Sequence, residues 1–256
     1  MRIMIPARAA ILFFCAAHLP LMAQRMGVPR LGCVVSAGGA VRMVYGLRAN
    51  FILGEAAQIE AVSAACSETN AVVKTTDALV VLDAEGRERH RFLAEAGAAL
   101  VSFRDDGDVG HVYLTATREL LRWENEEWVK ADLPHAGEIL SIGERDGAVV
   151  AVERRGEELW LVESRADGRY QVLSRFVSEA LFAVLLPDGS LVLAAGEKLV
   201  HRKPDGSQTE IEVPAAVTRL SVIGGKWVQV ETGVQRMAVR VEGGQAEAYY
   251  LPGEAR

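Results

Sequence analysis

The sequence predicts an all-β protein built from repeated four-stranded antiparallel sheets, and three observations support this fold class. Small residues recur at gaps of 39, 39, 42 and 38 positions, at Ser63, Ser102, Ser141, Ala183 and Ser221. An apolar residue stands directly before each of them, namely Val62, Val101, Leu140, Phe182 and Leu220. Turn residues form a second series with gaps of 40, 42, 38 and 38, at Gly86, Glu126, Gly168, Gly206 and Gly244. A repeat of about 40 residues with four short strands is typical of a β-propeller blade.

The first strand of each repeat carries the small residue, and we expect it to lie beside the propeller axis. Blades converge at the axis, so Ser or Ala fits there better than Leu. These strands are predicted near residues 58–64, 98–103, 138–143, 181–186 and 217–223. A hairpin turn follows in most repeats, as in 105–107 and 187–189, where Gly tolerates the positive φ that such turns need.

The remaining strands of each repeat differ in polarity. Second and third strands are nearly continuous apolar runs, such as 148–152 and 159–162, which indicates burial on both faces of the sheet. Fourth strands alternate, as in 210–213, where Ile211 and Val213 alternate with two glutamates. Alternation with charged residues is typical of an outer edge strand that faces water.

The region before the repeats predicts one more hairpin. Two apolar runs, 31–35 and 41–45, flank a Gly-containing turn about one period before Gly86. We interpret the hairpin as the outer two strands of an incomplete first blade, which makes six blades; the alternative is a five-bladed ring with an N-terminal hairpin. Segment 53–66 is rich in helix formers, so its first half is compatible with either a helix or a strand. The repeat register predicts a strand in its second half.

The N-terminus has the features of a signal peptide. Arg2 and Arg8 supply positive charge, 9–17 is apolar, and small residues allow cleavage after Ala23. We therefore expect a signal peptide at 1–23, a hairpin and connector at 24–56, and a five-repeat propeller at 57–256, in a protein exported to the periplasm or the extracellular space. The apolar run ends well short of the ~20 residues that span a bilayer, so we expect no transmembrane segment in the mature chain.

Two cysteines, Cys33 and Cys66, remain after the expected cleavage. We favour the interpretation that both are buried, unreactive thiols that behave as small apolar residues. The alternative is a disulfide, which an oxidising compartment would allow and which would tie the first hairpin to the first repeat.

One stretch carries a resemblance to known propellers. Pro187-Asp188-Gly189-Ser190-Leu191-Val192-Leu193 follows a small-residue inner strand, and its turn is echoed at 204–206. This arrangement resembles the blades of exported bacterial propellers in the broad NHL-like and YWTD-like group. The likeness covers most of 57–251 and implies the propeller fold without naming a subfamily.

Composition and motifs argue against several functions. The net charge is −6, and glutamates surround the densest basic run at 87–91, so we expect no binding to nucleic acid. No pair of histidines has zinc-site spacing, and no serine stands in a nucleophile elbow. The acidic stretch 105–108 lacks the spacing of a calcium loop, so we interpret it as a solvated turn. We predict no cofactor, and the sequence is compatible both with a bound divalent metal ion and with none.

The candidate binding residues lie in loops that a propeller places on one rim. His135 belongs to an inter-blade loop, and the turns between second and third strands, on the same rim, carry mixed charges. The candidates are His135, Arg118, Glu119, Arg155, Glu157 and Glu197.

These features favour a non-enzymatic, exported binding module for a protein or a small polar ligand. One alternative is a metal-dependent, lactonase-type hydrolase with its site in the central channel, whose ligands come from separate blades and leave no local motif. Another is an accessory domain that works only inside a larger assembly.

Overall fold

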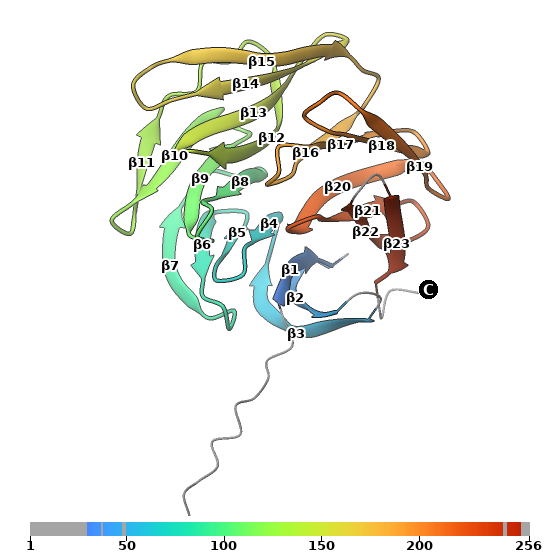
Figure 1. Cartoon of the computed structure of the whole chain (residues 1–256). Helices are drawn as coiled ribbons and strands as arrows, with labels where there is room; N and C mark the ends of the chain where they lie inside the picture. The colour runs from blue at the N-terminus through green and yellow to red at the C-terminus, as the bar shows by residue number, and fades with distance from the viewer. Residues whose placement is uncertain (1–29, 37, 48–49, 243–244, 252–256) are drawn as a thin grey trace, which may run out of the picture.

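A computed structural model describes residues 30–36, 38–47, 50–242 and 245–251. In these ranges the chain forms six antiparallel sheets around a common axis, and none of the described residues is helical (Figure 1). The predicted β-propeller is confirmed, with five four-stranded blades and a three-stranded first blade. The expected signal peptide, 1–23, lies outside the described residues. Within the described part, no helix could span a bilayer.

The first three blades follow the chain order. Blade 1 consists of β1 (Arg30–Val35), β2 (Ala40–Leu47) and β3 (Asn50–Glu60). Blade 2 consists of β4 (Ser63–Cys66), β5 (Ala71–Lys74), β6 (Ala78–Leu82) and β7 (Glu88–Leu93). Blade 3 consists of β8 (Ala99–Phe103), β9 (Val109–Leu114), β10 (Glu119–Glu124) and β11 (Glu127–Ala131).

The last three blades repeat this pattern. Blade 4 consists of β12 (Glu138–Arg145), β13 (Ala148–Arg155), β14 (Glu158–Ser164) and β15 (Tyr170–Val177). Blade 5 consists of β16 (Phe182–Leu185), β17 (Leu191–Ala195), β18 (Lys198–Arg202) and β19 (Gln208–Glu212). Blade 6 consists of β20 (Val217–Gly224), β21 (Trp227–Thr232), β22 (Arg236–Glu242) and β23 (Gln245–Tyr250).

The small-residue series lies on the inner strands, as predicted. Ser63, Ser102 and Ser141 belong to β4, β8 and β12, and these strands contact the inner strands of neighbouring blades. Two of the serines also join blades. The Ser63 hydroxyl accepts a hydrogen bond from the Ala99 backbone N–H at 2.9 Å, and the Ser141 hydroxyl accepts one from that of Leu185 at 3.0 Å. A serine at this position is therefore small enough for the axis and able to satisfy a backbone donor of the next blade.

The hydrophobic core is divided among the blade interfaces. Along β13, Val149 and Ala151 pack in the cluster shared with blade 3, whereas Val150 and Val152 pack in the cluster shared with blade 5. The continuous apolar runs are thus buried on both faces, as predicted. Each fully buried Val contributes roughly 1.5–3 kcal/mol of transfer free energy.

The first blade corrects the predicted hairpin. β1 and β2 pair as predicted, but β1 is the innermost strand of its blade, because it contacts β4 and β20, and β3 is the outermost. Residues 57–60, which we assigned to the first repeat, lie in β3. The segment left open for a helix is a strand, because pairing with β2 outweighs its helix propensity.

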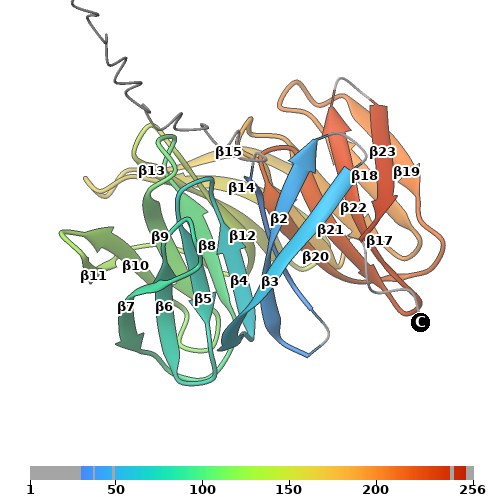
Figure 2. The same ribbon diagram turned by 90° about the horizontal axis from the view of Figure 1, so that it is seen from below.

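Strand direction shows which position of the first blade is not filled. β3 leads through 61–62 into β4, so it runs like the fourth strands of the other blades. Its antiparallel partners β2 and β1 then run like third and second strands. Within the described residues, the blade therefore has no strand at the first position, and β1 lies between blades 2 and 6. Figure 2 shows β2 and β3 of the same blade between β4 of blade 2 and β21 of blade 6.

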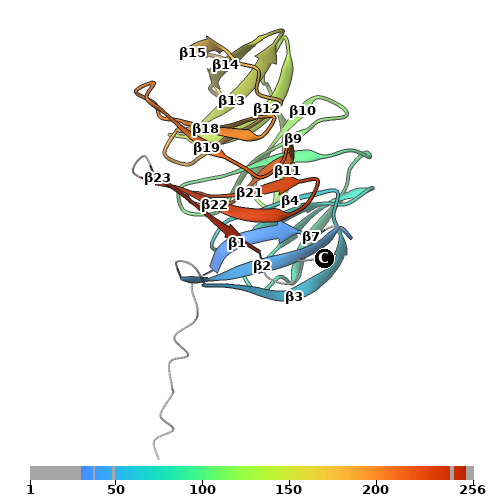
Figure 3. The ribbon, with the colours of Figure 1, turned by 90° about the vertical axis from the view of Figure 1, so that its right-hand side faces the viewer.

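Two glycines allow β1 to approach β20. A Cβ atom at Gly32 would overlap the carbonyl oxygen of Ile223, and one at Gly224 would overlap that of Leu31. The two backbones touch without intervening side chains, so this contact closes the ring between its first and last blades. Figure 3 shows β1 beside the last blade.

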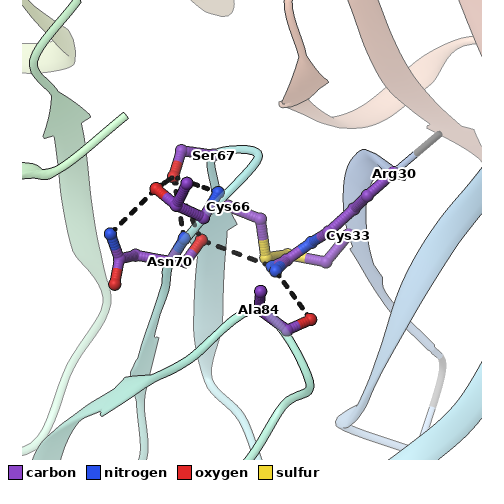
Figure 4. The surroundings of a disulfide bond; sticks show 7 residues. Arg30, Cys33, Cys66, Ser67, Asn70 and Ala84 are labelled. Atoms are coloured by element: carbon purple, nitrogen blue, oxygen red, sulfur yellow. Dashed lines mark hydrogen bonds between the residues drawn. A yellow bond between two sulfur atoms is a disulfide. The ribbon is translucent and has the colours of Figure 1, made fainter. Parts of the chain in front are cut away.

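A disulfide and an arginine attach β1 to blade 2 (Figure 4). Cys33 of β1 is bonded to Cys66 of β4, with their Cα atoms 5.6 Å apart. The structure thus contains the disulfide, not the two free thiols that we favoured. Arg30 donates hydrogen bonds to the carbonyl oxygens of Ala84 at 3.1 Å and Asn70 at 3.3 Å. β1 is therefore attached to blade 2 on one side and packed against blade 6 on the other.

The alternating strand directions define two faces of the ring. The inter-blade face carries the connections from each outer strand to the next inner strand, together with the turns between second and third strands. The hairpin face carries the turns between first and second strands and those between third and fourth strands. All six candidate binding residues belong to loops or strand ends on the inter-blade face.

A candidate binding face

Arg118 and His135 come together on the inter-blade face of blade 3. Arg118 donates from Nε to His135 Nε2 at 3.1 Å and from Nη2 to the Gly137 carbonyl oxygen at 2.8 Å. His135 Nδ1 lies 2.7 Å from the Leu133 carbonyl oxygen, which can only accept, so Nδ1 carries the proton. The Tyr113 hydroxyl, 3.1 Å from Nε2, is a second donor to that nitrogen. Both ring nitrogens are engaged, and His135 serves to hold its loop.

Arg155 reaches the same loop through Glu153, a residue that the sequence analysis did not single out. Glu153 is completely buried, and one of its oxygens accepts hydrogen bonds from the backbone N–H groups of Ala136 and Gly137. Its other oxygen forms an ion pair with Arg155 Nη2 at 2.5 Å. The inter-blade loop is therefore fixed from both sides, by Arg118 and by Glu153. Glu153 directly follows the apolar run 148–152, and this continuity was the one available signal of its burial.

The pKa of Glu153 reflects a competition between two effects. Burial alone would raise the pKa of this carboxyl, but the hydrogen bond from Arg155 and those from the backbone of Gly137 and Ala136 together lower it below its usual value. A carboxylate with a lowered folded pKa stabilises the fold above its unfolded pKa, and this contribution is lost as the pH falls through the folded value.

We expect Glu153→Gln to lower the free energy of unfolding by about 1–3 kcal/mol at pH 7, because an ion pair with a charged hydrogen bond is lost. The difference from the parent protein should shrink as the pH falls below about 4.5, where the parent carboxylate is protonated in the unfolded chain. Urea unfolding at several pH values measures this. The control is Glu157→Gln in the adjacent turn, which should change stability by less than about 0.5 kcal/mol. A Glu153→Gln deficit that is constant from pH 7 to pH 3 would contradict the assignment.

The other arginines of this face also have structural partners. Arg155 lies over the Trp160 ring at 4.3 Å from its centroid, a cation–π distance. Arg154 Nη2 donates to the carbonyl oxygens of Ala180 at 2.8 Å and Leu181 at 2.6 Å. The two Arg154 contacts hold the connection between blades 4 and 5 in one conformation.

Three of the predicted residues are not brought into this network. Glu119 pairs with Lys130 at 2.7 Å, across to β11 of its own blade. Glu157 and Glu197 are exposed in the turns of different blades. The six predicted rim residues therefore divide into two groups. His135, Arg118 and Arg155 belong to one connected cluster, whereas Glu119, Glu157 and Glu197 lie apart from it.

Most of the exposed large apolar side chains in the described chain lie on the inter-blade face. Ten large apolar residues of the described chain are exposed, and six of them stand in its loops or at the strand ends that border it. The six are Val62, Leu93, Val177, Leu181, Val234 and Tyr250. Leu93 is 90% exposed and Leu181 is 60% exposed. The sequence analysis missed them, because an apolar residue at the end of a strand looks the same whether the fold covers it or not.

The hairpin face carries most of the acidic turn residues noted in the sequence. Asp105 and Asp106 line a cavity of about 280 Å³ together with Glu144, Asp146 and Arg104. Glu144 also contacts a histidine: its carboxylate lies 3.0 Å from His111 Nδ1, and both side chains are largely buried. In the described part of the chain, no group of three or more His, Cys, Asp or Glu side chains is placed to hold a metal ion.

Comparisons with known proteins agree with the fold. No protein-family model matches the sequence, and no curated protein matches it. Among solved structures, a propeller in a nidogen/laminin complex is similar with a TM-score of 0.58 and 10% identity, over 89% of this chain and 95% of that chain. A protein of unknown function from Bacteroides caccae has a TM-score of 0.52 and 13% identity, over 83% of this chain and 90% of that one.

A streptogramin B lyase is also similar, with a TM-score of 0.50 and 13% identity, over 89% of this chain and 84% of that chain. Identities this low show the fold and nothing of the activity. The resemblance to the broad NHL-like and YWTD-like propellers is thereby confirmed at the level of the fold. The chain is a six-bladed β-propeller, and no named subfamily is assigned to it.

Proposed function

We propose that this chain is an exported, non-enzymatic β-propeller that binds a protein partner through its inter-blade face. The observation that carries the proposal is that six of the ten exposed large apolar side chains of the described chain lie on one face of the ring. Exposed apolar residues spread over all of a surface are ordinary, whereas their bias toward one face supports a protein-interaction surface. Export is supported by the charged, apolar and small-residue segments of 1–23.

The contacts beneath this face support the same function. Arg154 fixes the connection that carries Leu181, and Arg118 and Glu153 fix the preceding inter-blade loop on the same face, so these two loops lose little conformational entropy when a partner binds. The exposed Glu157 and Glu197 supply the polar groups that surround an apolar contact in protein interfaces. Similar propellers occur in complexes whose names include nidogen with laminin and BBS1N with ARL6DN.

Site-specific photo-crosslinking in the native cell tests this proposal. We place the crosslinker at Leu181 and at Leu93 on the inter-blade face, and at Asp167 in an exposed turn of the hairpin face as the matched control. The same adduct is expected from both leucine positions and none from 167. Glu in place of Val177 should weaken binding of the purified partner at least about tenfold, or 1.4 kcal/mol.

Two results would contradict the proposal. One is an adduct from position 167 as abundant as that from 181. The other is stoichiometric calcium or zinc in the purified protein, which would favour the channel hydrolase instead.

A further inference from the structure

A second cavity, of about 250 Å³, lies between blades 2 and 3 toward the hairpin face, away from the proposed docking surface. Strand β7, the turn between β8 and β9, and the turn between β10 and β11 supply most of its wall. Its lining side chains combine one aromatic ring, two arginines, a histidine, two amides and two carboxylates: Asn70, Arg89, His90, Arg104, Asp108, Trp123, Asn125 and Glu126. We call it the tryptophan cleft.

The aromatic wall of the tryptophan cleft is held rigidly. The Trp123 ring contacts Trp128, with centroids 4.7 Å apart, and both Phe92 and His90 lie 5.5 Å from it. Arg104 donates from Nη2 to the Trp123 carbonyl oxygen at 2.7 Å, which fixes the strand that carries the ring. The Trp123 side chain, which lines the cleft, is therefore held in one position by its neighbours, so a ligand meets it without rearrangement.

The charges at the mouth are less firmly paired. Glu126 lies in a turn with φ +65° and is 64% exposed at its side chain. Its Oε1 atom is 3.4 Å from Arg89 Nη2 and 3.6 Å from His90 Nε2. Exposed pairs at such distances contribute little stability, so their separation costs little. By contrast, Asp108 has a hydrogen-bonding partner in the wall of the cleft, since it accepts a hydrogen bond from Asn70 Nδ2 at 3.2 Å.

We propose that the tryptophan cleft binds a small ring compound that carries a carboxylate. The ring packs on Trp123, and the ligand carboxylate replaces that of Glu126 beside Arg89 and His90. The planar guanidinium of Arg89 suits a carboxylate, and Glu126 already places one at this position. Such a ligand has two sources, an acidic sugar of the cell envelope and a free aromatic acid. The proposal does not depend on the inter-blade face.

Titration calorimetry of the purified protein tests it with four probes: glucuronate, benzoate, glucose and acetate. A ring carboxylate should bind saturably with a Kd on the order of 1 mM, whereas glucose and acetate should not bind. Tighter binding of glucuronate assigns the site to acidic sugars, and tighter binding of benzoate assigns it to aromatic acids. Acetate binding as tight as that of either ring acid, or no saturation by either of them, would overturn the proposal.

Three variants distinguish the cleft from nonspecific charge attraction. Arg89→Gln should weaken binding about tenfold through loss of a charge-assisted contact. Glu126→Gln should tighten binding severalfold, because the competing carboxylate is removed. Arg87→Gln is the matched control, since Arg87 is exposed on the same hairpin, pairs with Asp83 and Glu85, and does not line the cleft. Equal losses in Arg87→Gln and Arg89→Gln, or weaker binding by Glu126→Gln, would exclude this site.

Discussion

Gly32→Ala is expected to abolish folding or to lower the free energy of unfolding by more than about 4 kcal/mol. The added methyl group would overlap the carbonyl oxygen of Ile223, and Gly32 has φ +149°, a backbone conformation that strains other residues. The obstacle is backbone rather than a flexible side chain, so the overlap disappears only if β1 moves away from β20. Gly224→Ala should have a comparable effect, because its methyl group would meet the Leu31 carbonyl oxygen from the other side.

Gly233→Ala is the matched control for the ring-closing glycines. Gly233 lies in the turn between β21 and β22, has no strained φ, and has open space where a Cβ would stand. Its replacement should change stability by no more than about 0.5 kcal/mol. Urea unfolding, together with size-exclusion chromatography of the folded state, measures both variants. A Gly32→Ala protein that unfolds at the parent midpoint would show that β1 does not close the ring against β20.

Replacement of both Cys33 and Cys66 by Ala is expected to lower the free energy of unfolding by about 3–4 kcal/mol. The disulfide links positions 33 residues apart, and the chain-entropy model assigns this value to a loop of that length. The loss should concentrate in the first blade, since its innermost strand is attached to blade 2 through this bond and through Arg30. Hydrogen exchange should therefore accelerate more in β1–β3 than in β12–β15.

Reducing agent supplies the control for the disulfide. It should destabilise the parent protein to nearly the same extent and should leave the double variant unchanged. Equal urea midpoints of the parent and the double variant under non-reducing conditions would contradict a stabilising bond. Equal acceleration of exchange in all blades would contradict the local effect.

The architecture could be predicted because it repeats. A series of small residues such as Ser63 and Ser102 marks the inner strands, and the double-faced burial of β13 appears as an uninterrupted apolar run. These signals are local, and the ring repeats them in successive blades. The first blade is the exception: its hairpin and its incompleteness were predicted, but the assignment of the hairpin to the two outer strands was wrong. Among the described residues, the blade has no first strand with a small residue, so the repeat could not show which positions the hairpin occupies.

The candidate site was partly predictable for the same reason. Arg118 and His135 could be placed on one rim from loop order, but their 3.1 Å contact depends on how two loops of blade 3 fold together. The apolar surface and the tryptophan cleft could not be predicted, since exposure and cavities are properties of neighbouring blades. Glu153 was missed because its partners are backbone N–H groups of another loop, which carry no residue-type signal.

The sequence by itself determined the repeat, the order of strands within each complete blade and the strand that faces the axis. These follow from residue size and polarity at regular intervals, which act within a single sheet. Only the tertiary structure decided how the ring closes, because Gly32 of the first blade meets Ile223 of the last blade. That contact depends on the sum of all the rotations between blades, and no local pattern of residues records that sum. The Cys33–Cys66 bond joins neighbouring blades, and it depends on how blade 1 packs against blade 2.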